Sequence, residues 1–331
     1  MKKFRFFLVF GLFFSFFIGS SQVINFPDPI LNGVLLSANT SNNIAQSEFE
    51  VPMVIDQNGN GQIEITEAQA VYRLNINGYA INDLTGLNHF INLTRLDCYY
   101  NFISILDVSS FTNLQRLDCY GNFITTIQFG ANTALTEVNC SNNQLTSLNL
   151  SNLPNLWEFN CDYNNLQTLS IPDSSTLYRF SCNNNQLSSL SFGNCSNLAF
   201  LYCSNNQLTS ITINNLPNLH RFEANHNLLT EINVSNMPQL RFFECKYNLL
   251  TDFDITNVNS IYPALDCFLD NNLLTFIKCK TNKIEYISFQ NNPNLTFICC
   301  DNTELTLFQD LANLAGLVNC YVTSNCSPEF F

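Results

Sequence analysis

Apolar residues recur along the middle of the chain at one fixed spacing. From Leu93 the sequence reads L-T-R-L-D-C, and the same order of apolar and polar positions returns every 21 residues. The full unit is L-x-x-L-x-C-x-x-N-x-L-x-x-L, and we call its cysteine the ladder position. A fixed period of this length predicts a solenoid, in which each unit forms one coil of a stack. The ladder position is occupied in turn by Cys98, Cys119, Cys140, Cys161, Cys182, Cys203, Ala224 and Cys245.

Each coil contains one segment in which apolar and polar residues alternate. Leu96 and Cys98 are predicted to point inward. Arg95, Asp97 and Tyr99 are predicted to point outward, because successive side chains of a strand face opposite sides. Stacked coils then form a parallel sheet, and the second L-x-x-L of each unit forms the opposite wall. The asparagine three residues after each ladder position should satisfy backbone groups at the turn, since burying an unpartnered amide costs about 1–3 kcal/mol.

The register changes after Cys245. Residues 256–280 are predicted to hold an irregular coil, in which Leu269 occupies the ladder position. Cys279 is expected to restart the period, because Cys300 follows it at the regular interval. The irregular coil is either drift in the repeat or a binding insertion.

This unit resembles the leucine-rich repeat. Residues 74–308 look like the secreted leucine-rich-repeat proteins of Gram-negative bacteria, with internalin-like adhesins as more distant relatives. The resemblance implies an α/β solenoid that is mostly β, a curved stack with a parallel sheet on its concave face and small helical caps. The predicted organisation is a signal peptide (1–21), an N-terminal cap (22–72), the repeats (73–308) and a C-terminal cap (309–331) that ends as abruptly as a truncated chain.

The N-terminal segment predicts secretion. Lys2, Lys3 and Arg5 precede an apolar run from Phe6 to Ile18, and small residues follow at Gly19 to Ser21. This run is shorter than the roughly 20 residues that span a bilayer, which favours a cleaved signal peptide over a membrane anchor. The protein is therefore expected to be secreted or held at the outer cell surface, with no transmembrane segment after signal removal.

Composition adds a constraint on partners. Thirteen basic residues, three of them in the signal peptide, face 26 acidic ones. The mature chain is therefore strongly acidic, and it should repel the phosphate backbone of nucleic acids. Nucleic acid is excluded as a partner on this ground.

The N-terminal cap contains a second motif. Residues 56–67 read D-Q-N-G-N-G-Q-I-E-I-T-E, with Gly61 at the sharp turn, Ile63 at the buried position and an exit helix beginning near Glu64. The segment resembles the EF-hand calcium loop, which implies structural calcium that fixes the cap. The alternative is an Asn/Gly turn without metal. The implied ligands are Asp56, Asn58, Asn60, Gln62, Glu64 and Glu67.

Fourteen cysteines in a secreted chain would ordinarily suggest a disulfide framework. Here most of them occupy one position of a repeat, and parallel side chains in register point the same way. The Cβ–S–S–Cβ torsion of a disulfide, about 90°, is hard to reach in that arrangement. The ladder is therefore predicted to consist of reduced, buried thiols. At the C-terminal end, Cys320 and Cys326 are predicted to form a disulfide.

The sequence contains no H-E-x-x-H, G-x-S-x-G, phosphate-binding glycine loop or paired C-x-x-C motif, and His89, His220 and His226 have no metal-ligand spacing. An enzyme is therefore not expected. Outward strand positions instead carry tyrosine, phenylalanine and arginine, the residue types that contribute most interface energy. Alternatively, the charged pairs only stabilise neighbouring strands, by about 0.2–1 kcal/mol each. The predicted partner-binding residues are Arg95, Tyr99, Tyr100, Arg116, Tyr120, Arg179, Phe200, Tyr202, Arg221, Phe242, Lys246 and Tyr247.

Together these features favour a secreted or cell-surface binding or adhesion protein that recognises a protein or glycan through its concave face. The rival interpretation is a targeting or spacer module of a larger exoenzyme or surface structural protein. The identity of the ligand does not follow from the sequence.

Overall fold

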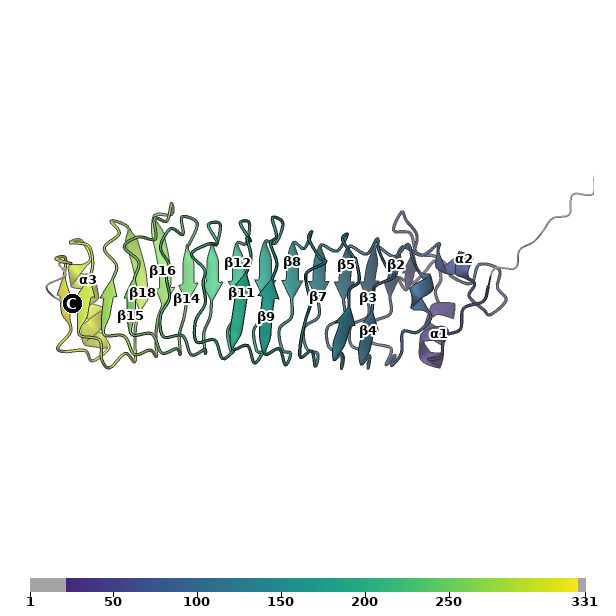
Figure 1. The fold of residues 1–331 in the computed structure, drawn as a ribbon, viewed down its shortest axis with the longest axis horizontal. Helices are drawn as coiled ribbons and strands as arrows, with labels where there is room; N and C mark the ends of the chain where they lie inside the picture. Colours follow the sequence, from purple (N-terminus) through teal and green to yellow (C-terminus); the bar gives the residue numbers. More distant parts are fainter. Residues whose placement is uncertain (1–21, 327–331) are drawn as a thin grey trace, which may run out of the picture.

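The computed structural model describes residues 22–326, and the predicted signal peptide (1–21) lies outside the described residues. Within that range the chain forms one row of stacked coils with a cap at each end (Figure 1). No helix in the described part is long and apolar enough to cross a membrane.

One sheet of 12 strands runs the length of the row, and we call its outward surface the long-sheet face. From β2 to β18 every neighbouring pair is parallel and in register, as when Leu117 pairs with Val138. β1 pairs with β2 in the antiparallel sense. The strands are β1 (Ala45–Gln46), β2 (Arg73–Asn75), β3 (Arg95–Asp97), β5 (Arg116–Asp118), β7 (Glu137–Asn139), β8 (Glu158–Asn160), β10 (Arg179–Ser181), β12 (Phe200–Tyr202), β13 (Arg221–Glu223), β14 (Phe242–Glu244), β16 (Ala264–Phe268) and β18 (Ile284–Ser288).

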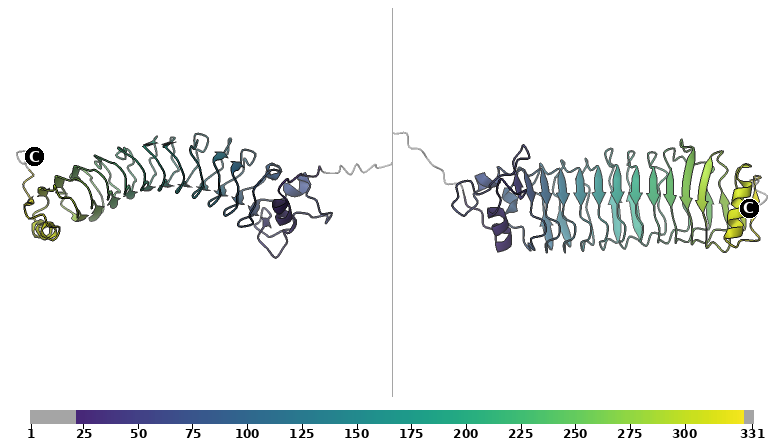
Figure 2. Two further views of the ribbon diagram at one scale, coloured as in Figure 1. Left: turned by 90° about the horizontal axis from the view of Figure 1, so that it is seen from below. Right: turned by 180° about the vertical axis from the view of Figure 1, so that it is seen from behind.

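The opposite wall is hydrogen-bonded only in parts. Its sheets are β4–β6 (Ile105–Asp107, Thr126–Gln128), β9–β11 (Thr168–Ile171, Ser189–Phe192) and β15–β17–β19–β20 (Asp252–Asp254, Phe276–Lys278, Phe297–Cys299, Tyr321–Thr323). The continuous sheet holds its strands about 4.8 Å apart, whereas the interrupted wall is free to spread. The row is accordingly bowed (Figure 2), and the predicted curved parallel-sheet solenoid is confirmed.

The helices lie at the ends of the stack. α1 (Pro29–Leu36) lies in the predicted N-terminal cap, and α3 (Leu305–Leu314) begins in the last predicted repeat and continues into the predicted C-terminal cap. α2 (Ile65–Ala68) and the 3-10 helix η1 (Leu87–His89) are single turns. Asp28 caps α1, because its carboxylate accepts the backbone N–H groups of Ile30 and Leu31 at 2.8 and 3.2 Å. The same carboxylate accepts the N–H groups of Asn82 and Asp83, and so joins the cap to the first coil.

The interior contains two ladders that run along the stack. All the ladder cysteines are buried free thiols, and burial raises their pKa. Each ladder asparagine connects two coils, as Asn164 illustrates. Its Nδ2 donates to the carbonyls of Cys140 and Cys161 at 3.1 Å, and its Oδ1 accepts the Leu145 N–H at 2.9 Å. The predicted role of the asparagines is therefore confirmed.

The predicted disulfide is wrong. Cys326 pairs with Cys299, with a Cα–Cα distance of 5.6 Å, and Cys320 is a buried free thiol. The reason lies in strand pairing, because β19 and β20 place Cys299 opposite Thr323. Cys326, three residues further on, then returns to Cys299.

The register predicted after the irregular coil is wrong in one respect. Leu269 does occupy the ladder position, since Asn272 donates to its carbonyl at 2.9 Å. The next ladder position, however, is Phe289. Cys267 pairs with Ile287, and Leu269 and Phe289 each lie two residues after these partners. Cys279 follows β17 on the opposite wall, which pairs with β19. Its interval to Cys300 is therefore the period of the other wall.

Candidate functional site

Three tyrosines gather near the N-terminal end of the long-sheet face. Tyr99 stacks on Tyr120 with ring centroids 4.9 Å apart, and Tyr100 meets Tyr120 edge-on at 4.6 Å. Gly121 lies under the Tyr100 ring, and a Cβ at this glycine would come within 2.6 Å of that ring. The structure thus brings together the three tyrosines that the sequence predicts, in a cluster that packs on itself.

The basic residues of the face are largely neutralised within the sheet. Arg179 has the loosest pairing, 3.8 Å from Glu158. Exposed pairs of this kind contribute about 0–1 kcal/mol, so they orient the side chains more than they stabilise the fold. The closer pairs are Arg95–Asp97 at 2.7 Å, Arg116–Glu137 at 2.6 Å, Arg221–Glu223 at 2.5 Å and Lys246–Glu244 at 3.0 Å.

Further along the stack, the cations lie over aromatic rings. The Arg221 guanidinium is 3.8 Å from the centroid of the Phe242 ring, and Lys246 Nζ is 4.8 Å from that of Phe268. Phe268 belongs to the irregular coil, and sequence reasoning missed it because the outward positions of that coil were not assigned. We call the following seven residues the arginine–aromatic patch: Arg179, Phe200, Tyr202, Arg221, Phe242, Lys246 and Phe268.

One column of residues along the edge of this face has a left-handed backbone. It lies two residues after each ladder position, where Asn142, Asn184 and Asn205 have φ between 53° and 57°. Tyr163 and Tyr247 occupy the same position with φ of 54°. Asparagine tolerates this conformation, whereas for other L-residues it costs roughly 1–2 kcal/mol. Tyr100 and His226 are the other aromatic residues of the column, with φ of 52°.

These column residues are exposed, and their exposure shows that burial does not explain them. Tyr100 is 61% exposed, Tyr163 56% and Tyr247 49%. The His226 and Tyr247 rings stack with centroids 4.2 Å apart. Sequence reasoning selected Tyr100 and Tyr247 but missed Tyr163 and His226. The available signal was an aromatic residue at a position that otherwise holds asparagine or glycine.

Beside this column runs a groove of about 430 Å³, which we call the rim groove. Tyr163 lines one end of it and the His226–Tyr247 stack the other. Its floor consists of polar side chains in hydrogen-bonded rows, among them Asn183, whose Oδ1 accepts the Ser204 N–H at 2.7 Å. The groove therefore combines aromatic surfaces with planar amide groups.

The predicted calcium loop is closed by its own side chains. Asp56 accepts the backbone N–H groups of Gly59 and Gly61, each at 2.9 Å. Asn58 and Asn60 donate from Nδ2 to the Glu64 carboxylate, at 3.1 and 2.8 Å. The loop thus converges on Glu64.

Glu64 and Glu67 lie side by side at the exit of this loop, and both are buried. Glu67 accepts the N–H groups of Gln57 and Glu64 at 2.8 and 3.0 Å. Burial raises the pKa of Glu67, and the adjacent Glu64 raises it further. Gln62 donates its backbone N–H to Asn60 Oδ1 at 2.8 Å, so all six predicted ligands belong to one compact loop. These oxygen donors fit a calcium ion in type and order.

Comparisons with known proteins agree with this fold. Residues 91–130 match the family model for leucine-rich repeats (two copies), and no curated protein matches the chain. The leucine-rich repeat domain of APL1B is 21% identical over 68% of this chain and 80% of that chain, with a TM-score of 0.51. YopM, a leucine-rich effector protein from Yersinia pestis, is 24% identical over 69% of this chain and 65% of that chain, with a TM-score of 0.50.

A third structure, InlJ from Listeria monocytogenes, is described as including a cysteine ladder. It is 23% identical over 85% of this chain and 76% of that chain, with a TM-score of 0.41. The family match and the similarity to the APL1B and YopM structures show that the chain is folded as a leucine-rich-repeat solenoid.

Proposed function

We propose that this protein binds another protein through its long-sheet face and acts without catalysis. The observation that carries the proposal is the column of exposed aromatic residues in a left-handed backbone, including Tyr163 and Tyr247. Their backbone conformation does not favour aromatic residues and their side chains are exposed, and unfavourable conformations of this kind concentrate at functional sites. The arginine–aromatic patch lies on the same face and supplies the residue types that dominate protein interfaces.

The rim groove supports a second candidate, a glycan ligand. Aromatic faces at both ends and amide side chains on the floor suit the apolar and hydroxyl surfaces of a sugar ring. In this case Tyr163 and His226 would contribute more than the patch does.

A screen of the mature chain against protein and glycan arrays identifies a ligand for testing both candidates. Replacing Tyr202, Phe242 and Tyr247 together with alanine should abolish capture of a protein ligand. Replacing Tyr163 and His226 with alanine should weaken capture of a protein ligand and abolish capture of a glycan.

A matched control lies outside the face. Phe102 and Phe123 are exposed stacked rings 5.9 Å apart, in the turns that follow the ladder asparagines. Replacing both with alanine removes a similar apolar area and should leave capture unchanged. Full capture by the two face variants, with the far-UV circular dichroism of the wild type, would contradict binding through this face.

We also propose that the protein acts outside the cell, on the basis of the predicted signal peptide. The mature protein recovered from culture medium should begin near Gln22. Recovery of the full-length chain from the cytoplasm would contradict this.

We further propose that the loop of residues 56–67 binds calcium and thereby fixes the N-terminal cap. Calcium should raise the melting temperature, and a chelator should reverse the rise. Glu67→Gln should reduce this response because it removes the charge of the last ligand. An unchanged melting temperature in wild-type protein would contradict the proposal.

A further inference from the structure

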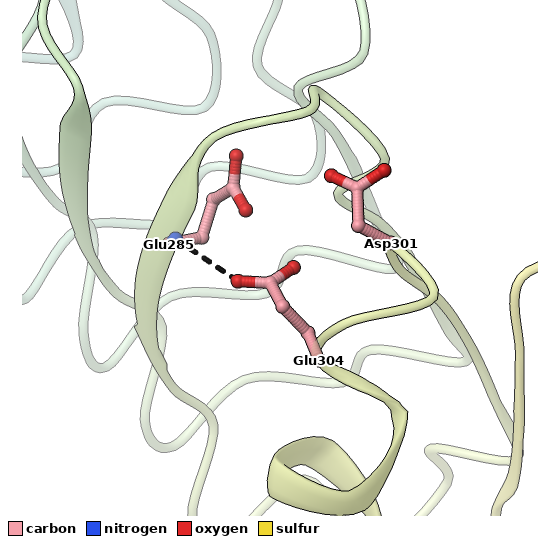
Figure 3. Close-up of side chains that lie close together, drawn as sticks. All are labelled: Glu285, Asp301 and Glu304. Atoms are coloured by element: carbon pink, nitrogen blue, oxygen red, sulfur yellow. Dashed lines mark hydrogen bonds between the residues drawn. The ribbon is translucent and has the colours of Figure 1, made fainter.

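Three buried carboxylates meet where the last coil contacts the C-terminal cap. Glu285 belongs to β18, Asp301 follows β19, and Glu304 immediately precedes α3 (Figure 3). One oxygen atom of each lies within 4.8 Å of the others. Glu285 is 2% exposed, Asp301 6% and Glu304 7%. Strand β18 and the turn of residues 301–304 thus direct three acidic side chains into one enclosed site.

Hydrogen bonds from the protein satisfy only some of the oxygen atoms of these carboxylates. Glu285 Oε1 accepts from the Thr281 hydroxyl, and Asp301 Oδ2 accepts the Asn282 N–H at 2.6 Å. Glu304 Oε1 accepts the Glu285 N–H at 3.2 Å, the contact drawn in Figure 3. The second oxygens, Glu285 Oε2 and Glu304 Oε2, are buried without a hydrogen-bond partner. Leaving such an atom unsatisfied costs about 1–3 kcal/mol, and more for a charged group.

The surrounding charges do not balance the cluster. Lys283 is close enough to lower the pKa of Glu285, but its ammonium group donates to the carbonyls of Ser260 and Tyr262. Burial, followed by the nearby Glu304, nevertheless raises the pKa of Glu285 to about 9. When all three carboxyl groups are ionised, they and the one ammonium group leave an excess of two negative charges.

We propose that Glu285, Asp301 and Glu304 form a binding site for one divalent cation, calcium in the first place. A doubly charged ion would neutralise the excess and supply a partner for both unpartnered oxygens. Three carboxylates are hard oxygen ligands of the kind that calcium prefers, and the Thr281 hydroxyl and water can complete its shell of six to eight oxygens. Zinc is disfavoured because the converging ligand atoms are all carboxylate oxygens.

The site would join the cap to the stack. Its three ligands come from the last strand of the long sheet, from the loop after the opposite wall and from the start of α3. Bound calcium would therefore hold these segments together at the open end of the solenoid. This site is independent of the loop of residues 56–67, which lies at the other end of the row.

Hydrogen–deuterium exchange, read peptide by peptide in the mature chain, tests the site locally. Calcium alone is the probe, and sodium chloride at matched ionic strength is the control. If the dissociation constant is on the order of 10⁻⁴ to 10⁻³ M, as in extracellular modules, about 10 mM calcium lowers the open population of residues 281–310 and slows their amide exchange roughly 10- to 100-fold.

Two sets of variants separate this site from the N-terminal loop. Glu285→Gln with Glu304→Gln keeps the side-chain shapes and should abolish the calcium-dependent protection of residues 281–310. Glu67→Gln should leave that protection intact. If the double variant fails to fold, Asp301→Asn is used in its place with the same expected loss.

Two results would overturn the proposal. One is an absence of calcium-dependent protection at residues 281–310 in the wild-type protein, or equal protection by sodium chloride. The other is full protection in the carboxylate variants, which would place the calcium elsewhere.

Discussion

Replacing Tyr163 with asparagine tests whether the exposed aromatic residues of the rim are retained for binding. Tyr163 has a φ of 54°, and more than half of its side chain is exposed. The corresponding residues of the two neighbouring coils, Asn142 and Asn184, have φ of 53° and 55°. The substitution therefore installs the residue that the adjacent coils already use at this position.

The expected change in stability follows from the backbone conformation. A left-handed conformation costs an ordinary L-residue roughly 1–2 kcal/mol, and asparagine recovers part of that through local hydrogen bonding. The exposed ring contributes little burial in return. We therefore expect Tyr163→Asn to raise the free energy of unfolding by about 1 kcal/mol, above the ±0.5 kcal/mol typical of surface substitutions. The same change should weaken ligand capture, since stability and binding are opposed at such a site.

Urea unfolding followed by circular dichroism measures the first effect, and binding to the ligand found by screening measures the second. Asn184→Tyr provides the reverse swap on the next coil and should lower stability by a similar amount. If Tyr163→Asn destabilises the protein instead, the ring contributes to the fold. The argument from backbone strain to binding would then be refuted.

Three further predictions concern residues that hold the fold together. Asn164→Ala leaves the buried Leu145 N–H without an acceptor and removes one of the two side-chain amide donors from the carbonyls of Cys140 and Cys161. It should therefore lower the free energy of unfolding by about 2–4 kcal/mol, whereas replacing the exposed Asn165 with alanine should change it by less than about 0.5 kcal/mol. Asp28→Ala should destabilise the N-terminal cap by at least about 1 kcal/mol in urea unfolding at neutral pH. Burial raises the Asp28 pKa, but four backbone N–H donors outweigh it and hold the pKa below 3.8, so the difference from wild type should shrink as the pH falls through 3.8 and below. The thiol of Cys161, fully buried and with its pKa raised by burial, should resist alkylation in native protein and react only after unfolding, and rapid labelling without urea would contradict the buried ladder.

The repeat itself could be predicted from the sequence because the information is local and periodic. Leu269 was identifiable as a ladder residue because Asn272 follows three positions later, as in every regular coil. The assignment of Cys279 to the ladder position was wrong because two residues of this region, Cys279 and Phe289, are each followed by an asparagine three positions later. Only the pairing of β16 with β18 decides between them. Pairing between coils of unequal length is a long-range property that no local spacing encodes.

The candidate binding face was predicted only in part for a similar reason. Outward strand positions followed from alternation, so Arg221 and Phe242 were assigned correctly to one surface. Phe268 joins them only because the irregular coil keeps its strand in register with β14. Tyr163 and His226 were missed because their significance depends on a backbone conformation that becomes evident only when the column is compared coil by coil.

The two ends of the stack show how differently motifs and folds indicate a cation site. At the N-terminal end, the ligands predicted from the sequence are contiguous, and the loop has already given their oxygens hydrogen-bond donors, as Asp56 and Glu67 show. At the C-terminal end, Glu285 and Glu304 belong to different elements, so no motif links them, yet each keeps a buried oxygen without a donor. A carboxylate satisfied by backbone N–H groups can do without metal, whereas a buried unpartnered one requires a proton or a cation. The C-terminal cluster therefore has the stronger physical need for an ion, although the N-terminal loop has the more familiar sequence.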